Sequence, residues 1–296
     1  MNKNRYICRM NTVKEIREGI VRSLTPHVGK DEAEAMARII LEDAAGESRT
    51  GAIIDPGRLL EDATVARISA IVGRVADGEP LQYVLGEAVF MGMRLRVTPH
   101  TLIPRPETAG LVDIITDAHL GHKDLQVIDI GTGSGCIAIA LARALPYCAV
   151  TAADISSEAL AVASYNASAL GTSNVKCIRL DALHLPMPAA PLYDIIVSNP
   201  PYVTVVEKAD MDRRVLDYEP GTALFVPDDD PLRFYRAIAV YAQSALRPGG
   251  SLYFEINPLY ATDMEQMLRY LAFEDVDIRR DYRGKKRYAA CLCPEK

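Results

Sequence analysis

Apolar residues in the N-terminal part of the chain recur at intervals of three and four, the spacing that places them on one face of an α-helix. The pattern predicts a first helix that starts at Thr12, where Thr12 and Glu15 form a capping box, and ends at Pro26. It also predicts a second helix that Gly46 closes and a third over residues 60–76. No group of polar side chains converges on these helices, so we expect a small helical unit that packs or docks without chemistry of its own.

The apolar spacing then shortens to two. Met93, Leu95 and Val97 alternate with arginines, and glycines interrupt the run, which is typical of a β-hairpin over residues 81–103. Prolines at positions 104 and 106 follow, and they impose a stiff, extended path that a helix does not cross. We therefore expect three parts along the chain: an N-terminal helical domain over 1–80, a β-hairpin linker over 81–104, and a second domain over 105–296.

From residue 126 on, short apolar runs alternate with amphipathic ones, as in a parallel α/β sheet with helices between its strands. The apolar runs predict strands over 126–130, 149–155, 175–180, 194–198 and 251–256. The amphipathic runs predict helices over 137–144, 158–170, 231–245 and 262–271, and the tail predicts antiparallel strands over 276–280 and 288–293. Ligands of such sheets bind outside the carboxyl ends of the strands, so residues that follow a strand are the candidates for a site.

The composition is that of an ordinary globular protein, and its charge bears on the choice of partners. The 296 residues include 33 Lys and Arg against 39 Asp and Glu, which gives a formal net charge of -6. This balance provides no long-range attraction to nucleic acid or to an anionic membrane, so we expect neither as a direct partner. No heptad repeat or exposed apolar stripe demands oligomerisation, and we expect a monomer.

The cysteines and histidines do not form a metal-binding pattern. The 6 cysteines are scattered without a CxxC pair, and the apolar surroundings of most of them predict buried free thiols. His119 and His122 have no third ligand nearby, and we expect them in a solvated polar connector. The chain has no secretory signal and no unbroken apolar run of the ~20 residues that a membrane helix needs, which favours a cytoplasmic protein.

A glycine-rich turn follows the first predicted strand of the sheet. It consists of Gly131, Thr132, Gly133, Ser134 and Gly135, and a helical run follows it directly. Such a turn lets a ligand approach the backbone and presents the unpaired N–H groups of the helix. A purely structural turn is the alternative for this motif taken alone.

Further positions distinguish between the cofactors that such a turn can bind. Asp154 ends the next strand, where a carboxylate can accept both hydroxyls of a ribose. The dinucleotide pattern G-x-G-x-x-G needs its third glycine where Cys136 stands, so NAD is disfavoured. The compact GxGxG form after Asp129 resembles the first motif of S-adenosylmethionine-dependent methyltransferases, and Ala182 lies where such enzymes place residues beside the adenine.

The strand over 194–198 runs directly into Asn199, Pro200, Pro201 and Tyr202. The two prolines stop the strand and hold the next carbonyls rigidly. An amide nitrogen is a poor nucleophile, but acceptance of its two N–H bonds by the Asn199 side-chain oxygen and the Pro200 carbonyl would aim its lone pair at a methyl donor. Tyr202 can stack on the planar amide. A strand-ending turn capped by Asn199 is the structural alternative.

The chain resembles the peptide chain release factor glutamine methyltransferases in four motifs: Gln-Tyr-Val-Leu-Gly at 82–86, Leu-Ile-Pro-Arg-Pro-Glu-Thr at 102–108, Asp-Ile-Gly-Thr-Gly-Ser-Gly at 129–135 and Val-Ser-Asn-Pro-Pro-Tyr at 197–202. This resemblance implies a Rossmann-like class I methyltransferase sheet with a small all-helical N-terminal domain and a β-hairpin linker. It implies methyl transfer from S-adenosylmethionine to the side-chain amide nitrogen (N5) of the glutamine in the Gly-Gly-Gln motif of release factors, which the helical domain would help to dock.

The resemblance also implies roles for individual residues. The tetrapeptide at 199–202 would be catalytic and bind the substrate amide, and Asn199 would also contact the cofactor. Arg105 and Glu107 would bind substrate beside the active cleft, although an exposed ion pair is an equally good interpretation of them.

Other functions fit the same motifs. The tetrapeptide alone does not distinguish a release factor from a ribosomal protein as the carrier of the glutamine. Methylation of adenine N6 in DNA poses the same chemical problem, but those enzymes usually need a basic recognition region and flip the base, and this chain is net acidic. A non-catalytic cofactor-binding scaffold is the third alternative, and retention of the tetrapeptide argues against it.

Overall fold

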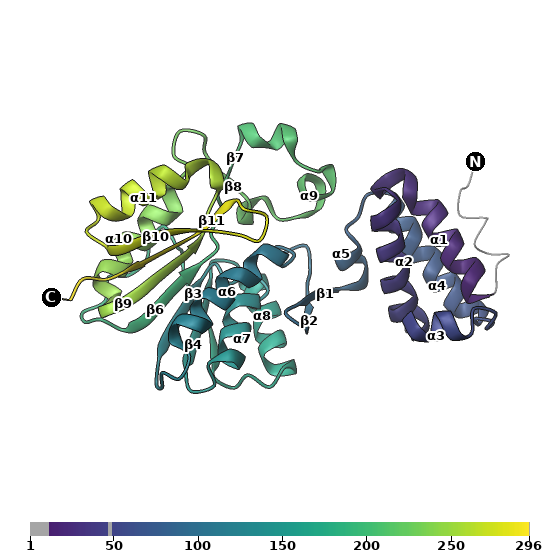
Figure 1. Cartoon of the computed structure of the whole chain (residues 1–296), viewed down its shortest axis with the longest axis horizontal. Helices are drawn as coiled ribbons and strands as arrows, with labels where there is room; N and C mark the ends of the chain where they lie inside the picture. Colours follow the sequence, from purple (N-terminus) through teal and green to yellow (C-terminus); the bar gives the residue numbers. More distant parts are fainter. Residues whose placement is uncertain (1–11, 47–48, 296) are drawn as a thin grey trace. The chain divides into compact units, whose positions relative to one another are not determined.

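The computed structural model describes residues 12–46 and 49–295, which form two compact units. One unit comprises the chain up to Gly86 together with Arg213–Tyr218, and the other comprises Glu87–Asp212 and the chain from Glu219 on (Figure 1). Within the described ranges, no helix is long and apolar enough to cross a membrane.

The N-terminal unit is helical, and apolar side chains at helical spacing form its core. Its helices are α1 Val13–Val28, α2 Lys30–Ala45, α3 Arg49–Ile54, α4 Asp62–Ala76, α5 Leu81–Leu85 and α9 Arg213–Tyr218. Ile16, Ile20, Ile40 and Ile68 are fully buried in one cluster, which confirms the predicted helical periodicity. Burial of a side chain of this size stabilises a fold by roughly 1.5–3 kcal/mol, so this core accounts for the cohesion of the unit.

The observed ends of α1 and α2 can be compared with the helix boundaries predicted from the sequence. The capping box of α1 is confirmed, because Glu15 N donates to Thr12 Oγ1 over 3.2 Å and Thr12 N donates to Glu15 Oε2 over 3.3 Å. Gly46 closes α2 in the left-handed conformation, as expected. The expected end of α1 at Pro26 is wrong, because the helix continues to Val28. Pro26 stands in the last turn of α1. Its missing N–H removes one helical hydrogen bond there, and only two helical residues follow it, so the proline does not end the helix.

The β-hairpin is shorter than expected from the sequence. β1 Glu87–Phe90 and β2 Met93–Arg96 form an antiparallel pair, and β2 alternates between buried and exposed residues as predicted. The segment Leu81–Leu85 is the short helix α5, so the prediction of a strand there is wrong. Pro80 precedes its first turn and Gly86 ends it with a φ of 77°, and both are end signals of a helix rather than a strand.

The second unit is built on a seven-stranded sheet in the order β10-β11-β9-β6-β3-β4-β5. Its strands are β3 Gln126–Ile130, β4 Ala149–Asp154, β5 Val175–Arg179, β6 Tyr193–Ser198, β9 Leu246–Glu255, β10 Glu274–Arg280 and β11 Lys286–Leu292. The strands β3, β4, β5, β6 and β9 run parallel, whereas β11 pairs antiparallel with β9 and with β10. The predicted parallel sheet with two closing antiparallel strands is therefore confirmed.

Helices cover both faces of this sheet (Figure 1). One face carries α6 Pro106–His119, α7 Cys136–Ala144 and α8 Ser157–Ala169, and the other carries α10 Arg233–Ala245 and α11 Ala261–Tyr270. Helix α6 is not expected from the sequence, where the prolines indicate only an extended path. Pro106 is instead the first residue of α6, a position where its missing N–H removes no helical hydrogen bond.

Helix α6 also changes the environment expected for His119. This residue ends the helix instead of lying in a solvated connector, and its Nε2 is 3.1 Å from the Tyr253 hydroxyl. Burial lowers the pKa of His119. The prediction of free thiols is confirmed for the described cysteines, of which Cys177 is half-buried and the others are buried: Cys136, Cys148, Cys291 and Cys293. Cys8 lies outside the described residues.

Candidate active site

A cavity of about 400 Å³ opens in the second unit at the carboxyl ends of the parallel strands. Its walls come from the start of α6, the turn after β3, the end of β4 and the segments after β5 and β6. Because β4 and β6 flank β3, the strand order reverses there, and a sheet of this kind leaves a crevice at such a reversal. The volume is in the range of sites for small molecules and cofactors.

The turn after β3 forms an open cradle in this cavity. Gly131, Gly133 and Gly135 have φ angles of 78°, 55° and 83°, which residues other than glycine adopt only with strain. A Cβ atom at Gly131 or Gly133 would meet no atom within 4 Å, so the space beside them is open to a ligand. Thr132 and Ser134 also line the cavity. Gly135 does not, and a Cβ there would lie 3.3 Å from the backbone of α8, so this glycine serves helix packing.

Asp154 ends β4 and lines the cavity next to the cradle. Its Oδ2 accepts a hydrogen bond from Gly133 N over 2.9 Å, and its Oδ1 accepts one from Ser156 N over 2.9 Å. A carboxylate has about four acceptor positions, so Asp154 keeps capacity for further hydroxyl donors. Ala182, in the segment after β5, also lines the cavity. All the residues predicted to bind the cofactor, except Gly135, therefore line this one cavity.

Asn199 stands directly beyond β6, and it lines the cavity together with Pro200 and Pro201. Its Nδ2 lies 3.5 Å from the hydroxyl oxygen of Thr108, in the first turn of α6. The Thr108 hydroxyl in turn donates to Glu255 Oε2 over 2.8 Å, at the end of β9. The amide nitrogen of Asn199 is thus engaged by the protein, and the tetrapeptide is tied to two other elements of the unit.

Tyr202 lies behind the cavity wall instead of on it. Its ring packs against the core cluster under α10 and α11, and its hydroxyl donates to Glu255 Oε1 over 3.2 Å. Burial, reinforced by the Glu255 charge, raises the pKa of Tyr202 well above its usual value, so the phenol stays protonated. Two phenyl rings do line the cavity, that of Phe225 in the short strand β8 Phe225–Val226 and that of Phe234 in the first turn of α10.

Arg105 and Glu107 have separate partners. Arg105 lines the cavity and pairs with the buried carboxylate of Glu219, which also accepts a hydrogen bond from Ile103 N over 3.2 Å. Glu107 does not line the cavity, and its Oε1 lies 3.6 Å from the guanidinium of Arg283. The alternative that Arg105 and Glu107 form an exposed ion pair with each other is therefore wrong.

Two residues of this site, Thr108 and Glu255, are not among those predicted from the sequence. Glu255 ends a parallel strand, and the rule that ligands bind beyond the carboxyl ends of strands could have identified it. Thr108 has a weaker signal, its place at the end of the segment over 102–108. Arg233 also lines the cavity and has no signal in the sequence that separates it from other surface arginines.

The fold and the cradle together define the class, a class I methyltransferase that depends on S-adenosylmethionine. Residues 108–217 match the family model of the methyltransferase small domain, and residues 20–86 match that of the PrmC N-terminal domain. A methyltransferase structure from Pyrococcus furiosus, 17% identical, gives a TM-score of 0.51 over 76% of this chain and 99% of that one, which shows the fold alone.

Curated relatives identify the family within this class. A release factor glutamine methyltransferase from Bacteroides thetaiotaomicron is 45% identical over 90% of this chain and 95% of that protein. Another, from Flavobacterium psychrophilum, is 38% identical over 93% of this chain and 97% of that protein. The chain belongs to the release factor glutamine methyltransferase family, and the sequence-based predictions of its fold, enzyme class and cofactor are confirmed.

Proposed function

We propose that this enzyme transfers the methyl group of S-adenosylmethionine to the side-chain amide nitrogen (N5) of the glutamine in the Gly-Gly-Gln motif of peptide chain release factors. The observation that carries this proposal is the position of Asn199, whose amide lines the cavity at the carboxyl end of β6, in the same space as the glycine cradle. The names of the relatives support the same class of substrate.

The cavity wall fits the cofactor. Gly131 and Gly133 leave open space beside the backbone, Asp154 keeps acceptor positions for the ribose hydroxyls, and Ala182 leaves room for the adenine. The bound cofactor supplies a sulfonium-activated methyl group. The protein contributes the orientation of the two reactants in this space, which can lower a barrier by ~7–11 kcal/mol in favourable cases.

Asn199 and Pro200 orient the substrate amide in this proposal. The lone pair of an amide nitrogen is delocalised into its carbonyl, so the nitrogen attacks only when its geometry is fixed. The Asn199 side-chain oxygen and the Pro200 carbonyl each accept one N–H of the glutamine, and the two prolines limit the movement of both acceptors. The product nitrogen becomes strongly acidic and loses its proton to water, so no strong base is required.

The remaining predicted residues have supporting roles. Arg105 lines the cavity, and Glu219 holds its guanidinium, so we assign it a contact with the substrate. Tyr202 supports the tetrapeptide from behind instead of stacking on the substrate. Glu107 holds the start of α6, because its carbonyl accepts a hydrogen bond from the Tyr288 hydroxyl over 2.6 Å.

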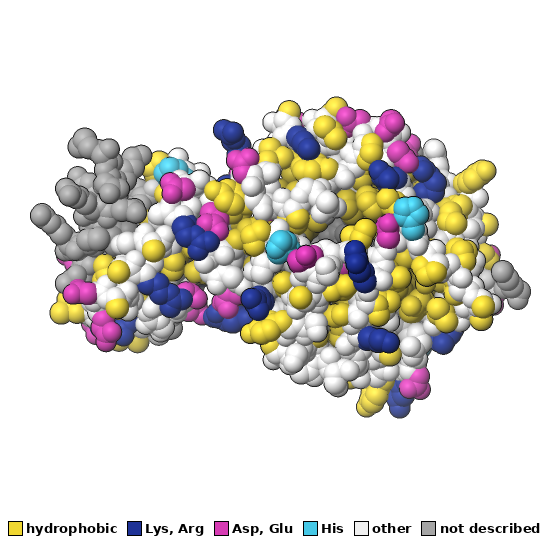
Figure 2. Space-filling view, turned by 180° about the vertical axis from the view of Figure 1, so that it is seen from behind, with side chains coloured by type: hydrophobic (Ala, Val, Ile, Leu, Met, Phe, Trp, Pro, Cys, Tyr) yellow, Lys and Arg dark blue, Asp and Glu magenta, His cyan; other side chains and the backbone are white. Residues whose placement is uncertain are grey.

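In this proposal, the helical domain over 1–80 docks the substrate, residues 81–104 form a linker that contains the hairpin β1–β2, and the domain over 105–296 carries out methyl transfer. It acts as a cytoplasmic monomer on a protein and not on nucleic acid. The formal charge of -6 supports this choice. On the face in Figure 2, side chains of Lys and Arg are interspersed with those of Asp and Glu and form no continuous basic surface.

The test is to incubate the enzyme with isotope-labelled S-adenosylmethionine and purified release factors, and to map the label by mass spectrometry. A single methyl group on the Gly-Gly-Gln glutamine is the expected result. Release factors with that glutamine changed to alanine, ribosomal proteins and adenine-containing oligonucleotides are the controls. Label on a ribosomal protein or an oligonucleotide, with none on the release factors, would overturn the proposal.

A further inference from the structure

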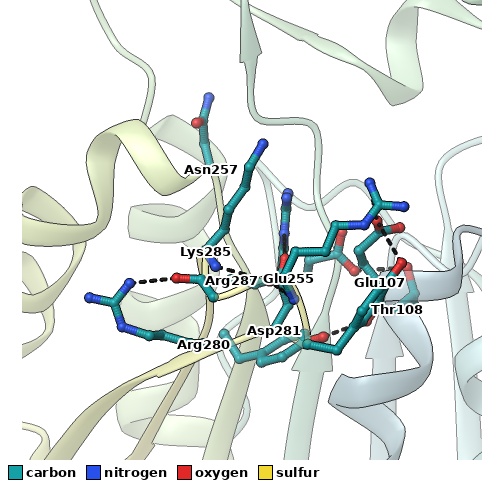
Figure 3. Close-up of polar contacts among 12 residues, drawn as sticks. Glu107, Thr108, Glu255, Asn257, Arg280, Asp281, Lys285 and Arg287 are labelled. Carbon is teal, nitrogen blue, oxygen red and sulfur yellow. Dashed lines mark hydrogen bonds and ion pairs between the residues drawn. The ribbon is translucent and has the colours of Figure 1, made fainter.

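Glu255 is a buried carboxylate that both flanks of the site contact. It is 1% exposed and is the last residue of β9. Its Oε2 accepts a hydrogen bond from the hydroxyl of Thr108 over 2.8 Å (Figure 3). Its Oε1 accepts one from the hydroxyl of Tyr202 over 3.2 Å. It does not line the cavity, so it does not touch the reactants.

The bonds around Glu255 have a defined direction. Burial raises the pKa of Glu255, whereas the hydroxyls of Thr108 and Tyr202 and the charge of Arg287 act in the opposite direction and favour its ionised form. An ionised carboxylate only accepts hydrogen bonds, so both hydroxyls then donate to it. Thr108 has a single hydroxyl proton, and once that proton points to Glu255 the Thr108 oxygen can only accept. The neighbouring group of Asn199 must then be its amide nitrogen, which is the group observed 3.5 Å away.

This direction determines which end of the Asn199 amide is left for the substrate. Because Nδ2 faces Thr108, Oδ1 is the end left free, and no described residue donates a hydrogen bond to it. A glutamine amide nitrogen carries two N–H donors, so it needs an acceptor there. If the Thr108 proton pointed to Asn199 instead, the amide would turn over and present its own donors to those of the substrate.

We propose that Glu255 is a positioning residue that acts through Thr108 to keep the Asn199 side-chain oxygen facing the substrate amide. The inference rests on the proposed methylation of a glutamine amide. Glu255 is not the base of the reaction, because it lies behind the wall. The orientation of Asn199 is therefore fixed by the charge state of a residue at the far end of β9 rather than by the tetrapeptide alone.

Substitutions that keep the shape but change the direction of the bonds test the proposal. In Glu255→Gln the side chain can donate to Thr108, and in Thr108→Val the link is lost. Both variants should lower kcat by about 10- to 100-fold, the loss expected from a misplaced reactant, while KM for the release factor and Kd for S-adenosylmethionine stay within about threefold. Thr108→Ser restores the hydroxyl and should restore kcat.

Tyr235→Phe is a matched control. Its hydroxyl donates to the backbone carbonyl of Glu255 over 3.0 Å, so this variant disturbs the same buried place without altering the link to Thr108. It should lower the thermal midpoint of unfolding and leave kcat unchanged. A parallel loss of kcat in Tyr235→Phe would mean that the site is merely sensitive to local packing, and would overturn the proposal.

A measurement independent of turnover separates this inference from the proposed function. In the NMR spectrum of the wild-type enzyme, the Asn199 side-chain amide protons should show a nuclear Overhauser effect to the Thr108 methyl group, and Glu255→Gln should abolish it. If the effect persists and kcat is unchanged in Glu255→Gln, the positioning role is wrong. If the wild-type enzyme fails to methylate release factors while the effect responds as expected, only the proposed substrate is wrong.

Discussion

The buried carboxyl of Asp129 makes the stability of this enzyme depend on pH in a defined direction. Asp129 is fully buried in β3, and burial, with a smaller contribution from the charge of Asp154, raises its pKa from 3.8 to about 7. A carboxyl that binds its proton more tightly in the folded state stabilises the fold fully at low pH, below its unfolded pKa. This contribution is lost as the pH rises through the folded pKa. At roughly 1.4 kcal/mol per pKa unit, the loss between about pH 4 and pH 7 is about 4 kcal/mol.

Urea unfolding at a series of pH values measures this contribution. Asp129→Asn cannot titrate, so its free energy of unfolding should lack this decline, whatever its absolute stability. Thr132→Val is a second variant with the opposite effect. The Thr132 hydroxyl donates to Asp129 Oδ2 over 2.6 Å and stabilises the ionised form, so its removal should raise the folded-state pKa further and extend the decline to higher pH. Equal pH dependence in the wild type and Asp129→Asn would refute this reasoning.

Three further predictions concern other parts of the molecule. Gly135→Ala should lower the free energy of unfolding in urea by more than the ~1–2 kcal/mol that a left-handed conformation costs, because the new Cβ would also crowd α8. Gly131→Ala is the control, since Gly131 has a similar φ but open surroundings. Asn199→Ala should lower methyl transfer at least about 100-fold, whereas calorimetry should show a much smaller loss of cofactor affinity, because the cradle and Asp154 remain. Undiminished transfer would contradict the role of Asn199. Thr12→Ala should destabilise the helical unit by about 1 kcal/mol through loss of the cap, as urea unfolding would show.

The cofactor cradle could be predicted from the sequence because its determinants are local. Gly131 and Gly133 have positive φ within a single turn, and Asp154 reaches that turn because it ends the strand paired with β3. The rule that parallel strands meet at one edge converts such sequence positions into neighbours without any knowledge of side-chain packing.

The predictions from sequence that were missing or wrong concern contacts between segments far apart in the chain, which a local residue pattern does not contain. Thr108 and Glu255 stand 147 residues apart, and they meet because α6 packs against β9, which pairs with β6 in the sheet. A proline such as Pro106 allows two opposite predictions. Proline disrupts a helix when it stands in the interior, but it is favoured at the first helical position, where Pro106 lies. The choice between them rests on the apolar face that follows, where Leu111 and Ile115 are fully buried in the core.

The contacts of Tyr202 show that the carboxyl end of β9 holds the tetrapeptide at 199–202 in position. An aromatic ring after two prolines suggests stacking on the substrate, but its hydroxyl is bound by Glu255 and its carbonyl accepts a hydrogen bond from Asn257 Nδ2 over 3.1 Å. Glu255 ends β9 and Asn257 follows it closely, so one strand end holds Tyr202 directly and Asn199 through Thr108. A reaction that depends on orientation needs that fixed frame, because a loop held only by its prolines would still pivot at both ends. Changes at the carboxyl end of β9 should therefore reduce turnover more than changes on the solvent side of the loop.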